Sequence, residues 1–109
     1  MMPQAFTSIL DAVLNKIAAL AESMFEADAD TAKMEAQTFI KNYEESIYIW
    51  FVEYKGGKLS DNDLEYLLQS IIELANMTAL KEAGIVETQL NQFRSGIVNV
   101  IIQAISNSA

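Results

Sequence analysis

The sequence predicts an all-α fold, specifically an antiparallel four-helix bundle. Apolar residues recur every three or four positions in four successive stretches, which is the spacing of one side of an amphipathic helix. Glycines and N-cap residues divide these stretches into helices over about residues 4–27, 31–55, 61–83 and 86–106. Short turns between the helices favour an up-and-down arrangement.

Length and composition indicate a single helical domain over residues 1–109. The chain has 109 residues, of which 51% are hydrophobic and 20% are charged, a composition that supports a buried core. It contains no cysteine and no histidine. Disulfide bonds, thiol catalysis and zinc sites built from these residues are therefore excluded.

The first half of the chain has no glycine or proline between Gln4 and Lys55, so one very long helix is the alternative to two. The two apolar stripes are centred roughly 120° apart around a helix axis, and a continuous rod could not present both to one neighbour. We expect the break at Asp28–Thr31, which is rich in N-cap residues. The first stripe contains Phe6, Leu10, Val13, Ile17, Leu20 and Met24, and the second contains Ala36, Ile40, Tyr43, Ile47, Trp50 and Tyr54.

The third helix has a clear start. The glycine pair 56–57 ends the preceding helix, and Ser60 is a strong N-cap residue. Leu59 and Leu64 occupy the two positions of a hydrophobic staple, which fixes how the chain enters the helix.

The same helix is expected to stop at Gly84, with Leu80 and Ile85 in the apolar positions of a Schellman motif. Between these ends, helical spacing predicts which residues face the core: Leu64, Leu67, Leu68, Ile71, Leu74, Ala75 and Thr78.

The fourth stretch contains the run 97–102, which is rich in β-branched residues, so a buried strand is the competing interpretation. We favour a helix, because a single strand would have no partner elsewhere in the chain. Gly96 then lies within the helix at a cost of about 1 kcal/mol relative to alanine, which suggests that another helix crosses closely there. The inward residues are Val86, Leu90, Phe93, Ile97, Val100, Ile101 and Ala104.

The charge is strongly acidic, with 15 Asp and Glu against 7 Lys and Arg and a net charge of −8. The basic residues are scattered, so neither nucleic acid nor an anionic membrane surface is an expected partner. The first residues lack the basic region of a secretory signal, and no apolar run approaches the roughly 20 residues that span a bilayer. We expect a cytoplasmic protein.

No pattern indicates a cofactor, a metal site or a catalytic group. The acidic stretch 61–65 resembles the opening of a calcium-binding loop, but Tyr66 replaces the glycine required at its sixth position. Helix capping accounts for these acids. Adjacent carboxylates such as Glu44 and Glu45 point in different directions and do not form a metal cage. The chain is therefore not expected to be an enzyme.

Two apolar regions are candidates for an interface. Aromatic residues gather in the second helix, where Tyr and Trp could serve as contact residues. The apolar face of the fourth helix is wider than one helix of a four-helix monomer needs, and two-fold pairing of two copies would cover it. The candidate interface residues are Tyr43, Tyr48, Trp50, Phe51, Tyr54, Ile97, Val98, Ile101, Ile102 and Ile105.

These observations favour a small structural or adaptor protein that acts through protein–protein contacts and self-associates, with a homodimer as the simplest form. Two alternatives belong to other classes. One is an acidic inhibitor or antidote that blocks a basic surface on another protein. The other is a helical bundle with an internal pocket for a small hydrophobic ligand, lined by aromatics of the second helix and by Met24, Met34 or Met77.

Overall fold

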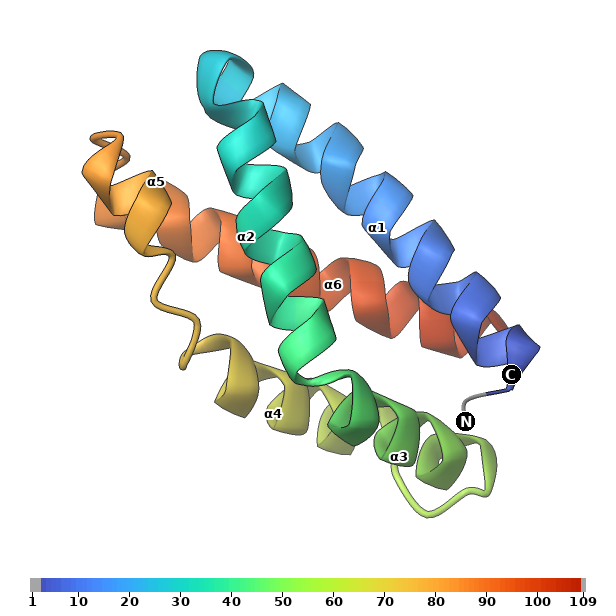
Figure 1. Ribbon diagram of the computed structural model, residues 1–109. Coiled ribbons are helices and arrows are strands. Elements are labelled where there is room, and N and C mark those ends of the chain that lie inside the picture. Colours follow the sequence, from blue (N-terminus) through green and yellow to red (C-terminus); the bar gives the residue numbers. More distant parts are fainter. Residues whose placement is uncertain (1–2, 109) are drawn as a thin grey trace.

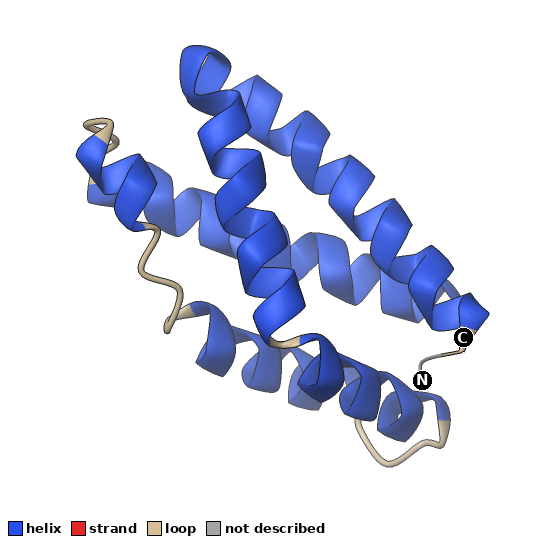
Figure 2. Cartoon of the chain, in the orientation of Figure 1, coloured by secondary structure: helices blue, strands red, loops and turns tan. Residues whose placement is uncertain are grey.

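Helices make up nearly all of the described chain. A computed structural model describes residues 3–108 and the side chains of residues 3–107; residues 1, 2 and 109, at the ends of the predicted domain, lie outside the described part. The all-α class is confirmed, since no strand occurs in residues 3–108 (Figure 2). In chain order the elements are α1 (Gln4–Phe25), the 3₁₀ turn η1 (Glu26–Asp28), α2 (Ala29–Asn42), α3 (Glu44–Lys55), α4 (Asp61–Ile72), α5 (Thr78–Glu82) and α6 (Glu87–Ser108).

The helices form an elongated body of 42 × 24 × 22 Å. α1 and α2 make a hairpin, and α6 runs behind it against α1 and α4 (Figure 1). α3 and α4 make a second hairpin along one edge, and the short α5 lies near α2. The run 97–102 is part of α6 and is therefore helical rather than a strand, and α6 contacts both α1 and α4.

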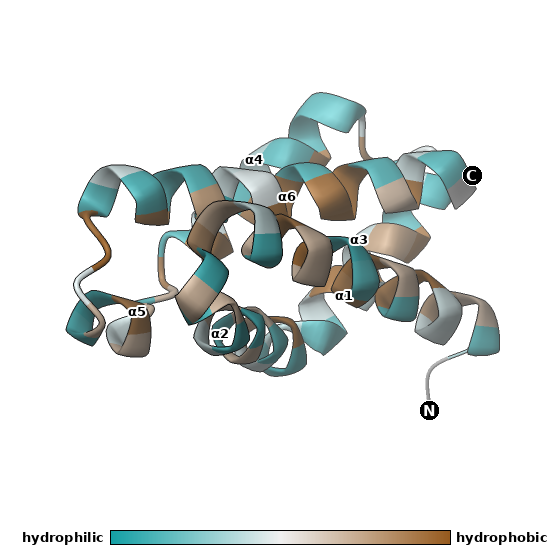
Figure 3. Ribbon diagram, turned by 90° about the horizontal axis from the view of Figure 1, so that it is seen from above, coloured by the Kyte–Doolittle hydropathy of each residue, from teal (hydrophilic) through white to brown (hydrophobic). Residues whose placement is uncertain are grey.

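The hydrophobic core is built around α1 and α6. Figure 3 shows hydrophobic bands along the middle of α6. The edge-to-face rings of Phe25 and Phe93 join the two helices, with 5.1 Å between centroids. α1 buries Phe6, Leu10, Val13, Ile17, Ala21 and Phe25, and α6 buries Leu90, Phe93, Ile97, Val98, Ile101 and Ile105.

The predicted start of the third helix is confirmed. The Ser60 hydroxyl accepts a hydrogen bond from the Asp63 amide at 3.1 Å, and the Asp63 carboxylate accepts one from the Ser60 amide at 3.0 Å. This reciprocal pair is a capping box. Leu64 of the expected staple is fully buried, and Leu59 is half-buried.

The predicted stop at Gly84 is also confirmed. The Ile85 amide donates to the Leu80 carbonyl and the Gly84 amide donates to the Lys81 carbonyl, the two bonds of a Schellman motif. Gly84 has φ +92°, a conformation in which glycine avoids the strain of a side chain. The equivalent glycine after α3 is Gly57, with φ +79°.

The break between the first two helices exists, but it starts slightly before the predicted position. η1 occupies Glu26–Asp28, and α2 already begins at Ala29 rather than at residue 31. Asp28 holds the N-cap position of α2, but its side chain makes no capping hydrogen bond. The turn instead has a positive φ at Glu26, with φ +42° and ψ −95°.

The predicted helix 31–55 is two helices rather than one. α2 ends at Asn42 and α3 begins at Glu44, and the linking residue Tyr43 has φ −114° and ψ 15°. Helical hydrogen bonds continue on both sides, since the Tyr43 amide donates to Phe39 and the Tyr43 carbonyl accepts from Ile47. The chain therefore bends without fully unwinding, and α3 turns towards α4 (Figure 1).

The predicted helix 61–83 is also interrupted. α4 ends at Ile72, and α5 begins only at Thr78 after a non-helical segment at 73–77. Met77 in this segment is buried and has a left-handed backbone, with φ +50°. Leu74, which was expected to point inward, is 64% exposed.

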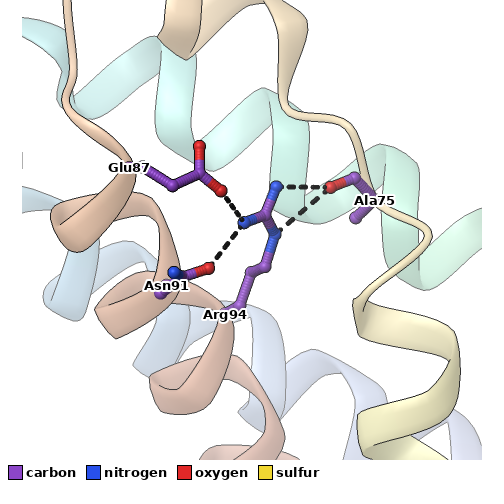
Figure 4. Close-up of polar contacts among 4 residues, drawn as sticks. All are labelled: Ala75, Glu87, Asn91 and Arg94. Carbon is purple, nitrogen blue, oxygen red and sulfur yellow. Dashed lines mark hydrogen bonds and ion pairs between the residues drawn. The ribbon is translucent and has the colours of Figure 1, made fainter.

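Side chains from two other helices hold this interruption. The Arg94 guanidinium of α6 donates two hydrogen bonds to the Ala75 carbonyl, at 2.9 and 3.2 Å (Figure 4). The carboxylate of Glu35 in α2 accepts from the Ala79 amide at 2.8 Å, in the first turn of α5. The segment contains no glycine or proline, and these contacts with α6 and α2 hold the chain where it leaves the helix.

The close approach expected at Gly96 is confirmed. A Cβ atom at this position would lie 2.5 Å from Cδ2 of Leu20, a residue of α1. α1 therefore packs against α6 at the point where α6 lacks a side chain.

Candidate functional site

The outer side of α3 is the best candidate for a contact surface. The exposed residues of this helix are Glu45, Ile49, Val52 and Lys55, which we call the outer stripe of α3. Ile49 is 55% exposed and Val52 is 49% exposed, one turn apart. Spacings of four, three and three residues place the stripe along one side of the helix.

The inner side of α3 explains why its outer side is uncovered. Ile47 and Phe51 are buried, and Phe6 of α1 packs on Tyr48 and Phe51 with centroid separations of 5.0 and 5.4 Å. The Tyr54 hydroxyl donates to the Asp61 carboxylate at 2.6 Å, which ties the end of α3 to the start of α4. Phe51 and Tyr54 therefore face the rest of the chain, whereas Tyr48, four residues before Val52 and seven before Lys55, lies at the border of the outer stripe.

The ten predicted interface residues fall into two groups. Four residues of α6 and Phe51 of α3 are buried by the chain's own helices, so they are core residues of the single chain. The apolar face of α6 is therefore buried within the chain and is not accessible to a second copy. The width of that face no longer supports self-association. The buried residues are Phe51, Ile97, Val98, Ile101 and Ile105, and the half-buried residues are Tyr43, Tyr48, Trp50, Tyr54 and Ile102.

Ile49 and Val52 were not among the predicted interface residues, although the sequence contains a signal for their exposure. They belong to the unbroken apolar run 47–52, which encircles the helix. A helix that is apolar on every side needs neighbours on every side. The run does not indicate which side stays uncovered, because that depends on where the other helices pack.

A surface cleft lies where the bend at Tyr43 meets the segment 74–78. It has a volume of about 250 Å³, and its walls include the aromatic pair Phe39 and Tyr43 together with the buried Met77. This volume is below the roughly 300–1,000 Å³ that is typical of small-molecule sites, whereas a neighbouring open cleft lined by Met34 has about 400 Å³. The predicted internal ligand pocket would include Tyr43 and Met77, but this cleft is open to the surface.

The Arg94 cluster, which contacts the cleft-lining residue Ala75, has a structural role. In addition to the Ala75 carbonyl, the guanidinium donates to the Glu87 carboxylate at 3.2 Å and to the Asn91 side chain at 2.9 Å (Figure 4). The Arg94 side chain is only 12% exposed. Its donors are directed at groups of its own chain, so it stabilises the fold around the cleft.

One ion pair shifts the pKa of both of its members. The Lys33 ammonium donates to the Glu22 carboxylate at 2.7 Å, between α2 and α1. This hydrogen bond lowers the pKa of Glu22 and raises the pKa of Lys33, because it favours the charged form of each group. The pair lies at the surface, away from α3 and the cleft.

Two searches of the described residues bear on other kinds of site. Residues 3–108 contain no group of three or more Asp or Glu side chains placed to hold a metal ion. None of the helices in this part of the chain is both long enough and apolar enough to cross a membrane.

Comparisons with known proteins find no relative. The chain matches no protein-family model, no curated protein and no solved structure.

Proposed function

We propose that this protein is a non-enzymatic helical module that acts through protein–protein contacts and self-associates through the outer stripe of α3. The observation that carries the proposal is the exposure of Ile49 and Val52 on adjacent turns of α3. Apolar side chains on adjacent turns combine into one patch, and burying such a patch against another protein is favourable.

The half-buried aromatics next to the stripe support this assignment. Tyr48 and Trp50 are neighbours of Ile49 in α3, and both keep part of their surface exposed. Tyr and Trp are enriched among the residues that dominate interface energies. Four predicted interface residues of α3 and its bend therefore remain accessible: Tyr43, Tyr48, Trp50 and Tyr54.

The proposal treats the fold as an antiparallel four-helix bundle with two interrupted members. In this description α1 and α6 would be the continuous members, and α2 with α3 and α4 with α5 would be the other two. The element order is compatible with this grouping. A cytoplasmic location belongs to the same proposal.

Sedimentation over a range of concentrations tests this function. The wild-type chain, with a mass of 12.1 kDa, should approach twice that mass reversibly as concentration rises. The double variant Ile49→Gln/Val52→Gln should remain monomeric, because it loses the apolar centre of the patch. Its circular dichroism should match wild type, since both residues are exposed.

Two variants serve as controls. Met34→Gln makes a similar change at a 67% exposed helical position on α2 and should associate like wild type. Ile102→Gln should also associate normally, because Ile102 lies on α6. A wild-type chain that stays monomeric at millimolar concentration would refute the proposal. Loss of association only in Ile102→Gln would move the contact to α6.

A further inference from the structure

The outer stripe of α3 carries opposite charges at its two ends. In chain order it reads Glu45, Ile49, Val52 and Lys55, an acid, two apolar residues and a base. We propose that the partner is a second copy of this chain, with the two α3 helices packed antiparallel about a two-fold axis between Ile49 and Val52. This inference rests on the proposed self-association and specifies its geometry.

The spacing of the stripe matches the antiparallel register. A helix rises about 1.5 Å per residue, so Glu45 lies about 6 Å along the axis from Ile49, and Lys55 lies about 4.5 Å from Val52. When Ile49 of one copy faces Val52 of the other, Glu45 and the second copy's Lys55 come to within about 1.5 Å of the same height. The two-fold axis produces this pairing twice.

The charges disfavour the parallel alternative. In a parallel pair at the same register, each Glu45 would face the other Glu45 and each Lys55 the other Lys55. Like charges in direct opposition repel, and complementary charges fix the register of an interface. The antiparallel orientation therefore satisfies both the apolar centre and the charged ends.

Lys55 is positioned to pair with Glu45 of the second copy. Its ammonium lies 5.3 Å from the centroid of the Phe51 ring, at the edge of the stripe. Its flexible side chain can turn from this weak contact to a carboxylate of the second copy. At the amino-terminal end of the stripe, Glu45 makes no side-chain hydrogen bond or ion pair within residues 3–107.

The length of α3 limits the strength of the dimer. Twelve residues span about 18 Å, and two such helices cover less surface than a stable complex buries. The dimer is therefore weak and forms at high protein concentration.

Charge reversal tests the orientation. Glu45→Lys alone and Lys55→Glu alone should each raise the dimer dissociation constant about tenfold, because either change puts like charges together twice. The double variant Glu45→Lys/Lys55→Glu should bring the constant back to within about threefold of wild type, because the pairs re-form with opposite polarity. In a parallel dimer, the single reversals would exchange one repulsive pair for another and leave the constant unchanged.

Disulfide trapping gives a second readout. Because the chain has no native cysteine, only the introduced thiols can form disulfides. A mixture of Glu45→Cys and Lys55→Cys chains should form disulfide-linked dimers readily, because these positions lie at nearly the same height in the antiparallel pair. Each variant alone should link poorly, because its own positions are offset by about 16.5 Å for residue 45 and about 13.5 Å for residue 55 along the axis.

The outcomes separate this inference from the proposed function. Efficient linking of each cysteine variant with itself, or single reversals without effect, in a protein that still dimerises would overturn the antiparallel pairing alone. Wild-type chains that never dimerise would overturn both the pairing and the self-association.

Discussion

Two apolar segments of this chain differ in how far they are buried. The run 97–102 in α6 and the run 47–52 in α3 are both hydrophobic on nearly all sides of a helix. In α6 the residues Ile97 and Ile101 are 0% and 1% exposed, whereas in α3 the residues Ile49 and Val52 keep about half of their surface. α6 passes between α1 and α4, but α3 lies at the edge of the molecule (Figure 1).

The difference shows that the apolar composition of a helix does not determine how far the helix is buried. The number of apolar residues in a helix sets how much surface it would be favourable to bury. Whether that surface is buried depends on how many neighbours surround the helix. Of these two helices, the one near the carboxyl end of the chain is enclosed by other helices, and the one at the edge of the molecule retains an uncovered side.

The largest expected effect comes from truncating one residue in each segment. Ile101→Ala should lower the free energy of unfolding by about 2–5 kcal/mol, because it leaves a cavity in the core. Ile49→Ala should change it by at most about 0.5 kcal/mol in dilute protein, because the side chain is exposed. Urea denaturation at low protein concentration measures both, and equal losses would mean that the two segments are equally buried.

A smaller effect is expected from the cluster that joins α6 to the segment 73–77. Arg94→Met should lower the free energy of unfolding by about 1.5–3 kcal/mol, because the Ala75 carbonyl loses a charged donor while the stem length is kept. Hydrogen exchange of the amides in 73–79 should rise more than in α3. Lys81→Met, at an exposed base in α5, is the control and should have little effect. Unchanged exchange in this segment would contradict the role of Arg94.

The smallest effect concerns the contact of Gly96 with Leu20. Gly96→Ala in a Leu20→Ala background should raise the free energy of unfolding by about 1 kcal/mol, because alanine is the better helix former and the obstructing methyl group is gone. In the wild-type background the gain should be smaller, since Leu20 must move. A double-mutant cycle measures this coupling. Equal gains in both backgrounds would show that α1 does not restrict α6 at this point.

The features that could be predicted from the sequence are those with a local cause. The capping box at Ser60 and the Schellman motif at Gly84 depend on residues within one helical turn, and both form as expected. The bend at Tyr43 and the break at 73–77 have no such signal. The break depends on Arg94, which follows Ala75 by 19 residues, and on Glu35, which precedes Ala79 by 44.

The candidate contact surface divides in the same way. The aromatic residues of the second predicted helix were proposed as a contact region, and this stays a prediction. An apolar excess was assigned to Ile97, Ile101 and Ile105 of α6, which the fold encloses. No local pattern separates these cases, because each helix carries the same kind of apolar run.

By itself, the sequence determined the all-α class, the ends of the helices at residues 57, 60 and 84, and the absence of cysteine and histidine chemistry, since backbone propensity and residue type set all of these. Only the tertiary structure decided where the second and third predicted helices are interrupted and which apolar run stays exposed. The physical reason is that hydrophobic burial is not directional. Periodicity indicates which side chains would be stabilised by burial, but only the packed arrangement of the helices determines which of them are buried.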